Sequence, residues 1–374
     1  MKISFWGDFV CCGRIPQQME VSADDIITDF KDVLNSCAFN VVNLESPIAY
    51  SGMKGILKEG AAISSQEIAL KWLKEEGFNV VTLANNHILD FGDDGIKNTL
   101  EKAEEYGLKT VGAGNNLQQA RQFLMLEDKN CKIAVINACE QEFSIATDTH
   151  AGANPINEID IYNEIQSAKL KADYVFVVIH GGHEYYQLPS PRTKKLYRFF
   201  IDAGANAVVA HHPHCFSGYE EYNDGFIFYS LGNFLFDMNS PSKLWYEGFG
   251  VSLKLNDGKM EYEVHPYVQC KEEPVVRIMN TEEIDIFNKR IDELSSIIAD
   301  DEKLKVEFEK FADSHARQYL ARVLPYSNHY LVALYKRGWF PSFMGRKKNV
   351  SIANAVRCEA HRDVLAYLLE KKLR

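Results

Sequence analysis

Residues 178–237 of this 374-residue chain read VIHGGHEYYQLPSPRTKKLYRFFIDAGANAVVAHHPHCFSGYEEYNDGFIFYSLGNFLFD. The stretch holds five of the chain's eleven histidines: His180, His183, His211, His212 and His214. His212 and His214 form an H-P-H motif directly after the apolar run 207–210. Imidazole is the commonest metal ligand in proteins, and several histidines at strand ends are typical of a metal site. The stretch therefore predicts strands that end in metal ligands.

Short apolar runs alternate along the chain with segments of helical periodicity. The runs are 3–6, 39–44, 79–83, 109–111, 133–137, 174–179, 207–210 and 226–231. The helical segments between them include 65–76, 92–106, 161–170 and 192–203. Strands that alternate with helices are typical of an α/β domain. Two later runs, 248–255 and 259–269, are joined by Asn256-Asp257-Gly258, a hairpin signal, so we expect part of the sheet to be antiparallel.

The pattern changes at about residue 281. Segments 282–300, 302–322 and 350–373 have helical periodicity, and no strand pattern lies among them. We therefore expect two regions: an α/β domain over residues 1–275 and a helical C-terminal region over residues 276–374.

Composition narrows the functional classes. The apolar content of 46% and the charged content of 25% are ordinary for a globular protein. The net charge of −11 argues against a nucleic-acid partner. No apolar run approaches the ~20 residues that span a bilayer, and the N-terminus does not read as a signal peptide. Eight cysteines without a C-x-x-C pair favour reduced thiols, so we expect a cytoplasmic protein with no transmembrane segment.

Polar side chains follow the apolar runs at the points where the strands should end. The candidates, in chain order, are Asp8, Glu45, Asn86, His87, His180, His212 and His214. In α/β folds, ligands gather at the carboxyl ends of the strands. A mixed set of oxygen and imidazole donors suits Mn, Zn or Fe better than Mg or Ca alone.

Six short motifs lie in order along residues 1–255: GDF at 7–9, NLESPI at 43–48, LANNHILDFGDDGI at 83–96, IHGGHEY at 179–185, IDAGANAVVAHHPH at 201–214 and IFYSLGNFLFD at 227–237. In these motifs the chain resembles the CapA, or poly-γ-glutamate capsule-biosynthesis, family, which is related in fold to the calcineurin-like metallophosphoesterases. A weaker match is AVRCEAHRDVL at 355–365. The resemblance implies a metallophosphoesterase-like αββα sandwich of mixed sheets, to which the C-terminal helices are appended.

The resemblance also implies a site for one or two divalent ions, Mn, Zn or Fe. The implied ligands fall into three sets: Asp8 and His214 for a first ion, Asn86, His180 and His212 for a second, and Glu45 as the bridge. His87 would lie beside the site as a proton donor or charge stabiliser, since the unperturbed pKa of histidine is near neutrality. In such sites the two ions jointly activate a water and neutralise charge on the substrate.

Two positions depart from the phosphoesterase pattern. The phosphoesterases carry a histidine two residues after the first aspartate, where this chain has Val10. Their bridging residue is usually aspartate, whereas this chain has the longer Glu45. Val10 removes a ligand from the first ion. His183 and His211 are left either as substitute ligands or as partners that orient the ligating rings.

Four further residues are candidates for contact with the substrate: Glu184, Tyr185, Arg192 and Asn233. Glu184 and Tyr185 suit a structural role equally well, and Asn233 suits a turn. Arg192 begins a basic helix that would either attract an anionic substrate or form a solvated helix face.

A basic and aromatic segment, YKRGWFPSFMGRKK, occupies residues 335–348. Five basic residues stand beside Trp339, Phe340 and Phe343. Such a mixture is typical of contact with a membrane surface or a polyanion, and also of a loop packed between helices.

These observations predict a metal-dependent hydrolase that acts on an anionic polymer or a small anionic substrate. The scissile bond would be an amide of the poly-γ-glutamate type or a phosphoester. The alternative is a non-catalytic, accessory component of capsule or exopolysaccharide biosynthesis that binds polymer in the same cleft. Hydrolysis of nucleic acid has no support from the acidic composition.

Overall fold

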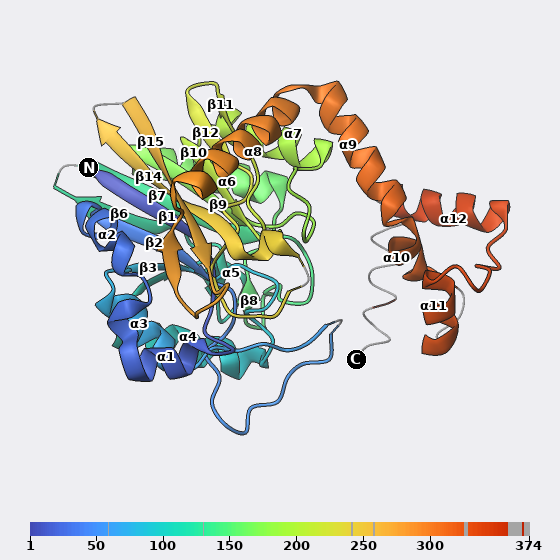
Figure 1. Ribbon diagram of the computed structural model, residues 1–374, viewed down its shortest axis with the longest axis horizontal. Coiled ribbons are helices and arrows are strands. Elements are labelled where there is room, and N and C mark those ends of the chain that lie inside the picture. The colour runs from blue at the N-terminus through green and yellow to red at the C-terminus, as the bar shows by residue number, and fades with distance from the viewer. Residues whose placement is uncertain are drawn as a thin grey trace. The chain divides into compact units, whose positions relative to one another are not determined.

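The computed structural model describes residues 1–58, 60–129, 131–240, 242–256, 259–324, 328–357 and 369. The chain divides into two compact units, Met1–Lys305 and Val306–Arg374. The first unit contains all the described strands and the helices that cover them (Figure 1).

The first sheet is mixed. Its strands lie in the order β16 (Val276–Ile278), β15 (Lys259–Gln269), β14 (Glu247–Asn256), β1 (Lys2–Val10), β2 (Phe39–Leu44), β3 (Val80–Thr82) and β4 (Lys109–Val111). β1 runs parallel to β2 and antiparallel to β14. Near its carboxyl end β1 also pairs in parallel with β13 (Asn233–Phe236).

The second sheet is mixed as well. Its order is β11 (Tyr219–Tyr222), β12 (Gly225–Phe228), β10 (Ala207–His211), β9 (Tyr174–His180), β7 (Cys131–Cys139) and β6 (Leu124–Asp128). The four inner strands are parallel to one another, and β11 and β6 are antiparallel to their neighbours. The inner strands are buried on both faces, which explains their continuous apolar sequence.

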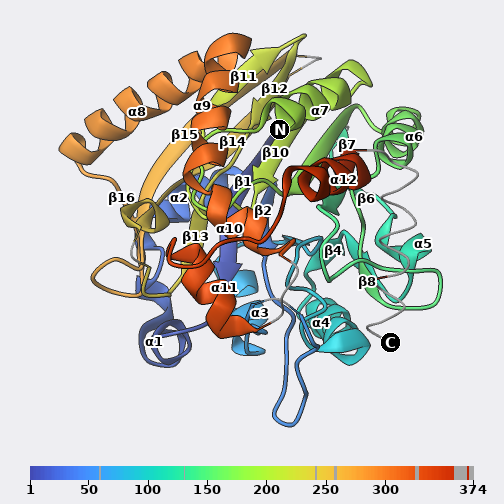
Figure 2. The same ribbon diagram turned by 90° about the vertical axis from the view of Figure 1, so that its right-hand side faces the viewer.

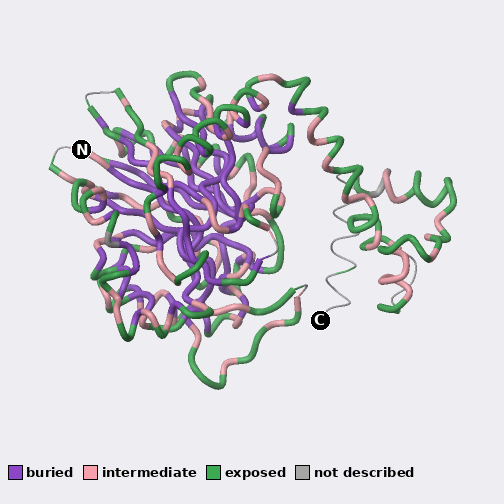
Figure 3. Tube along the Cα trace, viewed as in Figure 1, coloured by how far each residue is buried: buried purple, intermediate pink, exposed green. Residues whose placement is uncertain are grey.

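The two sheets pack face to face around a core that includes Phe5, Val41, Phe176 and Phe228. Figures 1 and 2 show helices outside both sheets. The first sheet is covered by α1 (Ile15–Ser22), α2 (Lys31–Ser36), α3 (Ile68–Glu75) and α4 (Gly92–Glu105). The second is covered by α6 (Glu158–Lys169) and α7 (Pro191–Asp202). The expected αββα sandwich of mixed sheets is confirmed, and Figure 3 shows that burial is concentrated in its strands.

Short elements complete the unit. They are η1 (Ala23–Asp25), η2 (Thr28–Phe30), β5 (Ala113–Gly114), α5 (Leu117–Ala120), β8 (Gly152–Ala153) and η3 (Lys243–Tyr246). Among the helices that the structure describes, none combines the length and the apolar character that crossing a membrane requires.

One predicted strand was wrong in its extent. The apolar run 226–231 is not a single strand, because β12 ends at Phe228 and β13 begins at Asn233. Gly232 lies between them with a φ of +76°, and the chain passes there from the second sheet to the first. The predicted antiparallel pair is confirmed as β14 and β15, whereas Asp257 and Gly258 of its turn lie outside the described residues.

Helix α8 (Thr281–Ala299) packs on the first unit. Asn280 and Glu283 form a capping box at its start. On its apolar face, the Phe287 ring lies 4.8 Å from the Phe216 ring. The first compact unit extends to Lys305, and α8 buries its apolar face against the core between the sheets.

Four more helices follow: α9 (Asp301–Ser314), α10 (Ala316–Ala321), α11 (His329–Lys336) and α12 (Arg346–Arg357). The helix predicted over 302–322 is interrupted at His315. Most of the helix predicted over 350–373, and most of the motif at 355–365, lie outside the described residues.

Candidate metal centre

The carboxyl ends of strands from both sheets meet at one buried cluster. It contains Asp8 of β1, Glu45 directly after β2, His180 at the end of β9, and His212 and His214 just after β10. Strand pairing accounts for part of this arrangement, because β1 pairs with β2 and β9 pairs with β10. The structure thus brings together the strand-end residues that the sequence singled out.

Two groups of donor atoms can each hold a metal ion. One consists of Glu45, His180 and His212, and the other of Asp8, Glu45 and His214. Within each group the ligand atoms all lie within 4.8 Å of one another. Glu45 belongs to both groups.

Glu45 shows that this donor set fits a cation. Both of its carboxylate oxygens are buried, and neither has a hydrogen-bond partner in the structure. The nearest basic atoms are His180 Nε2 at 3.4 Å and His214 Nε2 at 3.7 Å from Oε1. Burial raises the pKa of Glu45, and the neighbouring His214 opposes this rise. A buried carboxylate without a hydrogen bond is unfavourable unless a cation compensates it.

Asp8 is aimed at the cluster by an irregularity in β1. The register of β1 against β2 shifts between Trp6 and Asp8, and a bulge of this kind redirects a side chain. Gly7 permits the bend, since a Cβ there would lie 2.0 Å from the carbonyl oxygen of Gly232. Burial, followed by the charge of Glu45, raises the pKa of Asp8 to about 8.

Two hydrogen bonds fix the Asp8 carboxylate. Asn43 Nδ2 donates to Oδ1 at 2.7 Å, and the backbone N–H of His212 donates to Oδ2 at 3.2 Å. His212 has a φ of 98°, an uncommon value for a residue that is not glycine. Backbone strain of this kind clusters at functional sites, where the surrounding structure enforces it.

The side chains of His212 and Asn86 both contact the same nitrogen of His180. His180 Nε2 lies 3.1 Å from His212 Nδ1 and 3.0 Å from Asn86 Oδ1. Burial lowers the pKa of both imidazoles below the ordinary value, so both are neutral at physiological pH. A neutral imidazole has a lone pair available for coordination.

His214 belongs to the other donor group. Its Nδ1 lies 2.9 Å from Asn233 Oδ1, and its ring centroid lies 4.9 Å from that of Trp245. Burial opposes the charged form of His214, but the neighbouring carboxylates Glu45 and Asp8 outweigh it and raise the pKa.

His87 lies beside the cluster in a second network. Its Nδ1 contacts Asp90 Oδ2 at 2.7 Å and Lys58 Nζ at 2.9 Å. Lys58 also bonds Asp90 Oδ1 at 2.5 Å, with its side chain only 4% exposed. Asp90 additionally accepts from the backbone N–H of Ile63, so it ties His87 to the long connection between β2 and α3.

His211, His183 and Val10, which the sequence singles out as possible substitutes or departures at the first ion, have different surroundings. His211 ends β10, and its buried Nδ1 lies 3.4 Å from Asp8 Oδ1, where burial lowers its pKa to about 3. His183 is half-buried, and its ring centroid lies 6.4 Å from that of Tyr186. Val10 is wholly buried and packs with Phe236 and Trp245.

The candidates for substrate contact occupy different surroundings. Tyr185 and Glu184 are exposed, and the Tyr185 ring centroid lies 6.4 Å from that of His214. Arg192 is exposed and pairs with Glu140 at 3.3 Å. Asn233 is wholly buried and engages His214. The structure thus places Asn233 as a partner that orients a histidine.

Sequence reasoning missed three residues of this region. Asn43 stands inside the NLE motif at the end of β2, so its position was visible, although its bond to Asp8 was not. Lys58 lies in a connection without periodicity, and Trp245 lies in the short helix η3. The chain around Lys58 and Trp245 carries no signal that would connect them with the histidine motifs.

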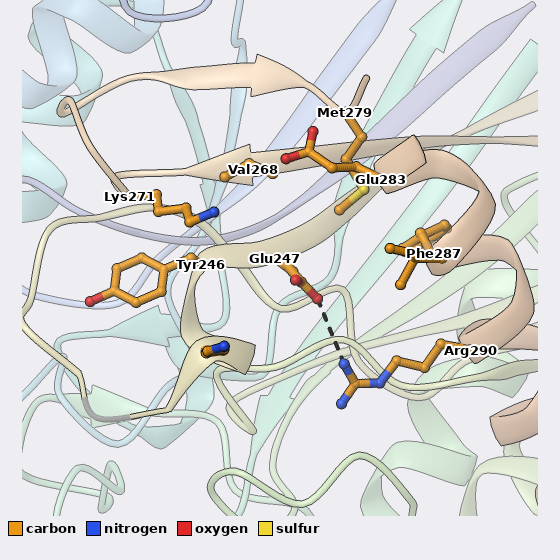
Figure 4. A pocket seen from close by; sticks show the side chains of 10 residues that line it. Tyr246, Glu247, Val268, Lys271, Met279, Glu283, Phe287 and Arg290 are labelled. Atoms are coloured by element: carbon orange, nitrogen blue, oxygen red, sulfur yellow. Dashed lines mark ion pairs between the residues drawn. The ribbon is translucent and has the colours of Figure 1, made fainter. Parts of the chain in front are cut away.

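A separate cavity of about 360 Å³ lies at η3, β15 and α8. Figure 4 shows Tyr246, Glu247 and Arg290 at its wall, with an ion pair of 3.7 Å between Glu247 and Arg290. None of the residues in the two donor groups lines it.

Comparison with known proteins identifies the family of this chain. Residues 2–238 match the family described as bacterial capsule synthesis protein PGA_cap. The chain belongs to this family, and the resemblance seen in the motifs is confirmed.

Two curated relatives are similar to part of the chain. The capsule biosynthesis protein CapA of Bacillus anthracis is 36% identical over 203 residues, which cover 52% of this chain and 49% of that protein. The PGA biosynthesis protein CapA of Bacillus subtilis is 32% identical over 243 residues, which cover 63% of each chain. The chain thus spans about half to just under two thirds of the length of these relatives.

A solved phosphatase from Mycoplasma pneumoniae aligns with 77% of this chain and 98% of its own. The TM-score is 0.46 and the identity 14%. A likeness of this size carries no information about activity, so the function has to be argued from the site itself.

Proposed function

We propose that this protein is a metal-dependent hydrolase whose centre is formed by Asp8, Glu45, Asn86, His180, His212 and His214. The observation that carries the proposal is Glu45, a buried carboxylate with two unsatisfied oxygens that is shared by two groups of metal donors. Divalent cations such as Mn, Zn or Fe supply Lewis-acid chemistry and an activated water when they are bound in such a site.

The chain's own residues have distinct roles in this proposal. Asp90 accepts a hydrogen bond from His87 Nδ1 at 2.7 Å, which orients the imidazole. In the imidazolium form of His87, Nδ1 donates to Asp90 and Nε2 holds the second proton, which is the one that passes to the leaving group. Lys58 Nζ lies 2.9 Å from His87 Nδ1 and pairs with Asp90, so it helps to hold this network in place.

We infer an anionic substrate, either an amide of the poly-γ-glutamate type or a phosphoester. The curated relatives support the first class, since their names refer to capsule and PGA biosynthesis. The donor set supports both classes equally, because carbonyl and phosphoryl oxygens both develop negative charge during hydrolysis.

Elemental analysis and activity assays test this proposal. The purified protein should contain Mn, Zn or Fe and should hydrolyse a phosphoester or a γ-glutamyl peptide. Asp8→Asn and His212→Ala should each abolish both metal retention and hydrolysis. His150→Ala, which alters an exposed histidine, serves as the matched control and should change neither. Absence of bound metal together with absence of any metal-induced thermal stabilisation would refute the proposal.

An accessory role in capsule assembly is the second candidate. Among the described residues, Asp8, Glu45 and His214 form a group of three donors, and Val10, at the position where the phosphoesterases carry a further histidine, packs in the core. Metal-loaded protein that binds poly-γ-glutamate in equilibrium dialysis, but hydrolyses neither substrate class, would favour this role over catalysis.

A further inference from the structure

The helices that the structure describes in the second compact unit have no buried core. None of the residues of this unit whose burial the structure describes, 306–324, 328–353, 356 and 369, is buried, and Figure 3 shows intermediate and exposed colours for them. Helices of this length are only marginally stable in water without packing on a partner surface. The apolar side chains of the unit therefore require something to cover them.

Charge indicates what that partner is. Residues 314–357 contain eight basic residues and no acidic one: Arg317, Arg322, Lys336, Arg337, Arg346, Lys347, Lys348 and Arg357. Since the whole chain carries −11 and this segment carries +8, the remaining residues together carry −19. So sharp a separation of charge within one acidic chain is typical of a surface that meets a polyanionic partner.

Exposed aromatic side chains accompany these charges. Trp339 is 74% exposed and Phe343 is 70% exposed. Phe343 also has a φ of 52°, an uncommon conformation for a bulky residue. Its ring lies 5.3 Å from that of Phe340, so two aromatic rings lie together in the segment that follows α11.

The backbone holds Trp339 outside its helix. Gly338, with a φ of 78°, ends α11, and its N–H donates to the Tyr335 carbonyl at 2.8 Å. The Trp339 N–H donates to the Leu334 carbonyl at 2.9 Å, which completes a Schellman motif. The residue at the Trp339 position of this motif usually packs back against the helix, whereas here the indole is largely exposed.

We propose that residues 314–357 dock on the surface of an anionic phospholipid bilayer. Tryptophan and phenylalanine enter the boundary between headgroups and acyl chains, while lysine and arginine remain among the anionic headgroups. A soluble polyanion would satisfy the basic residues but would leave the aromatic rings in water, which favours the bilayer. The contact is interfacial, and it does not depend on the proposed metal centre.

Tryptophan fluorescence provides a specific readout. The chain has four tryptophans, and Trp6, Trp72 and Trp245 are wholly buried in the first unit. A blue shift of the emission when vesicles are added, with quenching by brominated acyl chains, would therefore report on Trp339. Trp339→Phe should lose this signal and still sediment with vesicles.

Sedimentation of the full chain with vesicles is the decisive test. The protein should bind vesicles of phosphatidylcholine mixed with phosphatidylglycerol and should fail to bind phosphatidylcholine alone. Lys347→Glu/Lys348→Glu should lower the partition coefficient at least about tenfold, because each basic residue contributes about a factor of five near an anionic surface. Trp339→Ser/Phe343→Ser should lower it as well.

Matched controls alter equally exposed residues of the first unit. Lys71→Glu/Lys97→Glu and Ile159→Ser/Leu170→Ser should bind vesicles as the wild type does. Circular dichroism checks that every variant is folded. Failure of the wild type to bind anionic vesicles, binding of soluble poly-γ-glutamate in place of vesicles, or equal losses in the controls would each overturn the proposal.

Discussion

Asn233 holds the ring of His214 in a defined orientation. Asn233 Oδ1 lies 2.9 Å from His214 Nδ1, and Asn233 Nδ2 donates to the Trp245 carbonyl at 3.2 Å. The backbone carbonyl of Trp245 can only accept a hydrogen bond, so the Asn233 amide must direct its NH2 group toward Trp245 and its oxygen toward His214. Because that oxygen accepts, the proton is assigned to His214 Nδ1. The lone pair of His214 is left on Nε2, the nitrogen that lies 3.7 Å from Glu45.

We expect Asn233→Leu to weaken metal binding. The substitution removes the partner that orients His214, and the loss of such a partner typically lowers metal affinity about 10- to 100-fold. Titration calorimetry with Mn²⁺ or Zn²⁺ measures this effect. Asn154→Leu, which alters a buried asparagine outside the cluster, should leave the affinity unchanged. Equal affinities for Asn233→Leu and the wild type would contradict the orienting role.

Glu45→Gln should have opposite effects on the metal-free and metal-loaded protein. Without metal, it removes a buried charge that has no hydrogen bond, so the free energy of unfolding should rise by about 1–2 kcal/mol. With Mn²⁺ or Zn²⁺, the stabilisation seen in the wild type should disappear.

Thermal scans with chelator and with metal measure both effects of Glu45→Gln. Glu164→Gln, which alters a residue in neither donor group, should keep the metal response. A Glu45→Gln variant that is less stable without metal and still stabilised by it would argue against a bridging carboxylate.

Lys58→Met should destabilise the protein by about 3 kcal/mol, because it leaves the buried Asp90 carboxylate without its ion pair. It should also speed proteolysis in the connection between β2 and α3, which Asp90 fastens through Lys58 and Ile63. Urea unfolding and limited proteolysis are the measurements. Lys54→Met, an exposed position in the same connection, should have neither effect.

Phe287→Ala should lower the free energy of unfolding of the first unit by about 3–5 kcal/mol, the usual range for a buried phenylalanine. The reason is that Phe287 packs against Phe216 and Phe249 in the core between the sheets. Ile286→Ala, one residue away and largely exposed, should change it by less than about 0.5 kcal/mol. Similar effects of the two substitutions would mean that α8 does not belong to this unit.

Stability should depend on pH through Glu164. Burial raises the pKa of Glu164 from 4.5 to about 7, against the opposing charge of Arg121. Between pH 4.5 and 7, Glu164 is ionised in the unfolded chain but still protonated in the folded chain. The contribution of Glu164 to the free energy of unfolding is therefore fully present below pH 4.5 and is lost as the pH rises toward 7. Glu164→Gln should remove this loss, and the difference between variant and wild type should grow by about 2 kcal/mol across the interval. Urea unfolding over a pH series measures this. A difference in the free energy of unfolding between Glu164→Gln and the wild type that does not change with pH would contradict the prediction.

The amino-acid sequence by itself determined most of the central strands and the order of the strand-end residues. The strands β2 and β4 have the bounds that we predicted for them, 39–44 and 109–111, and every residue of β2 is buried. Asp8, Glu45 and His180 could be predicted at one edge because each stands at the end of such a run.

Tertiary structure alone decided how these residues are supported. The apolar run 226–231 begins in β12 of the second sheet and leads to β13 of the first. The crossing at Gly232 is visible only from the pairing of these strands in the structure. Lys58 reaches Asp90 from a connection without periodicity, and Asn233 turns from a candidate for substrate contact into the partner of His214. Periodicity records which face of an element is buried, but not which other element buries it. The ligands were therefore visible in the sequence, whereas the contacts that orient them were not.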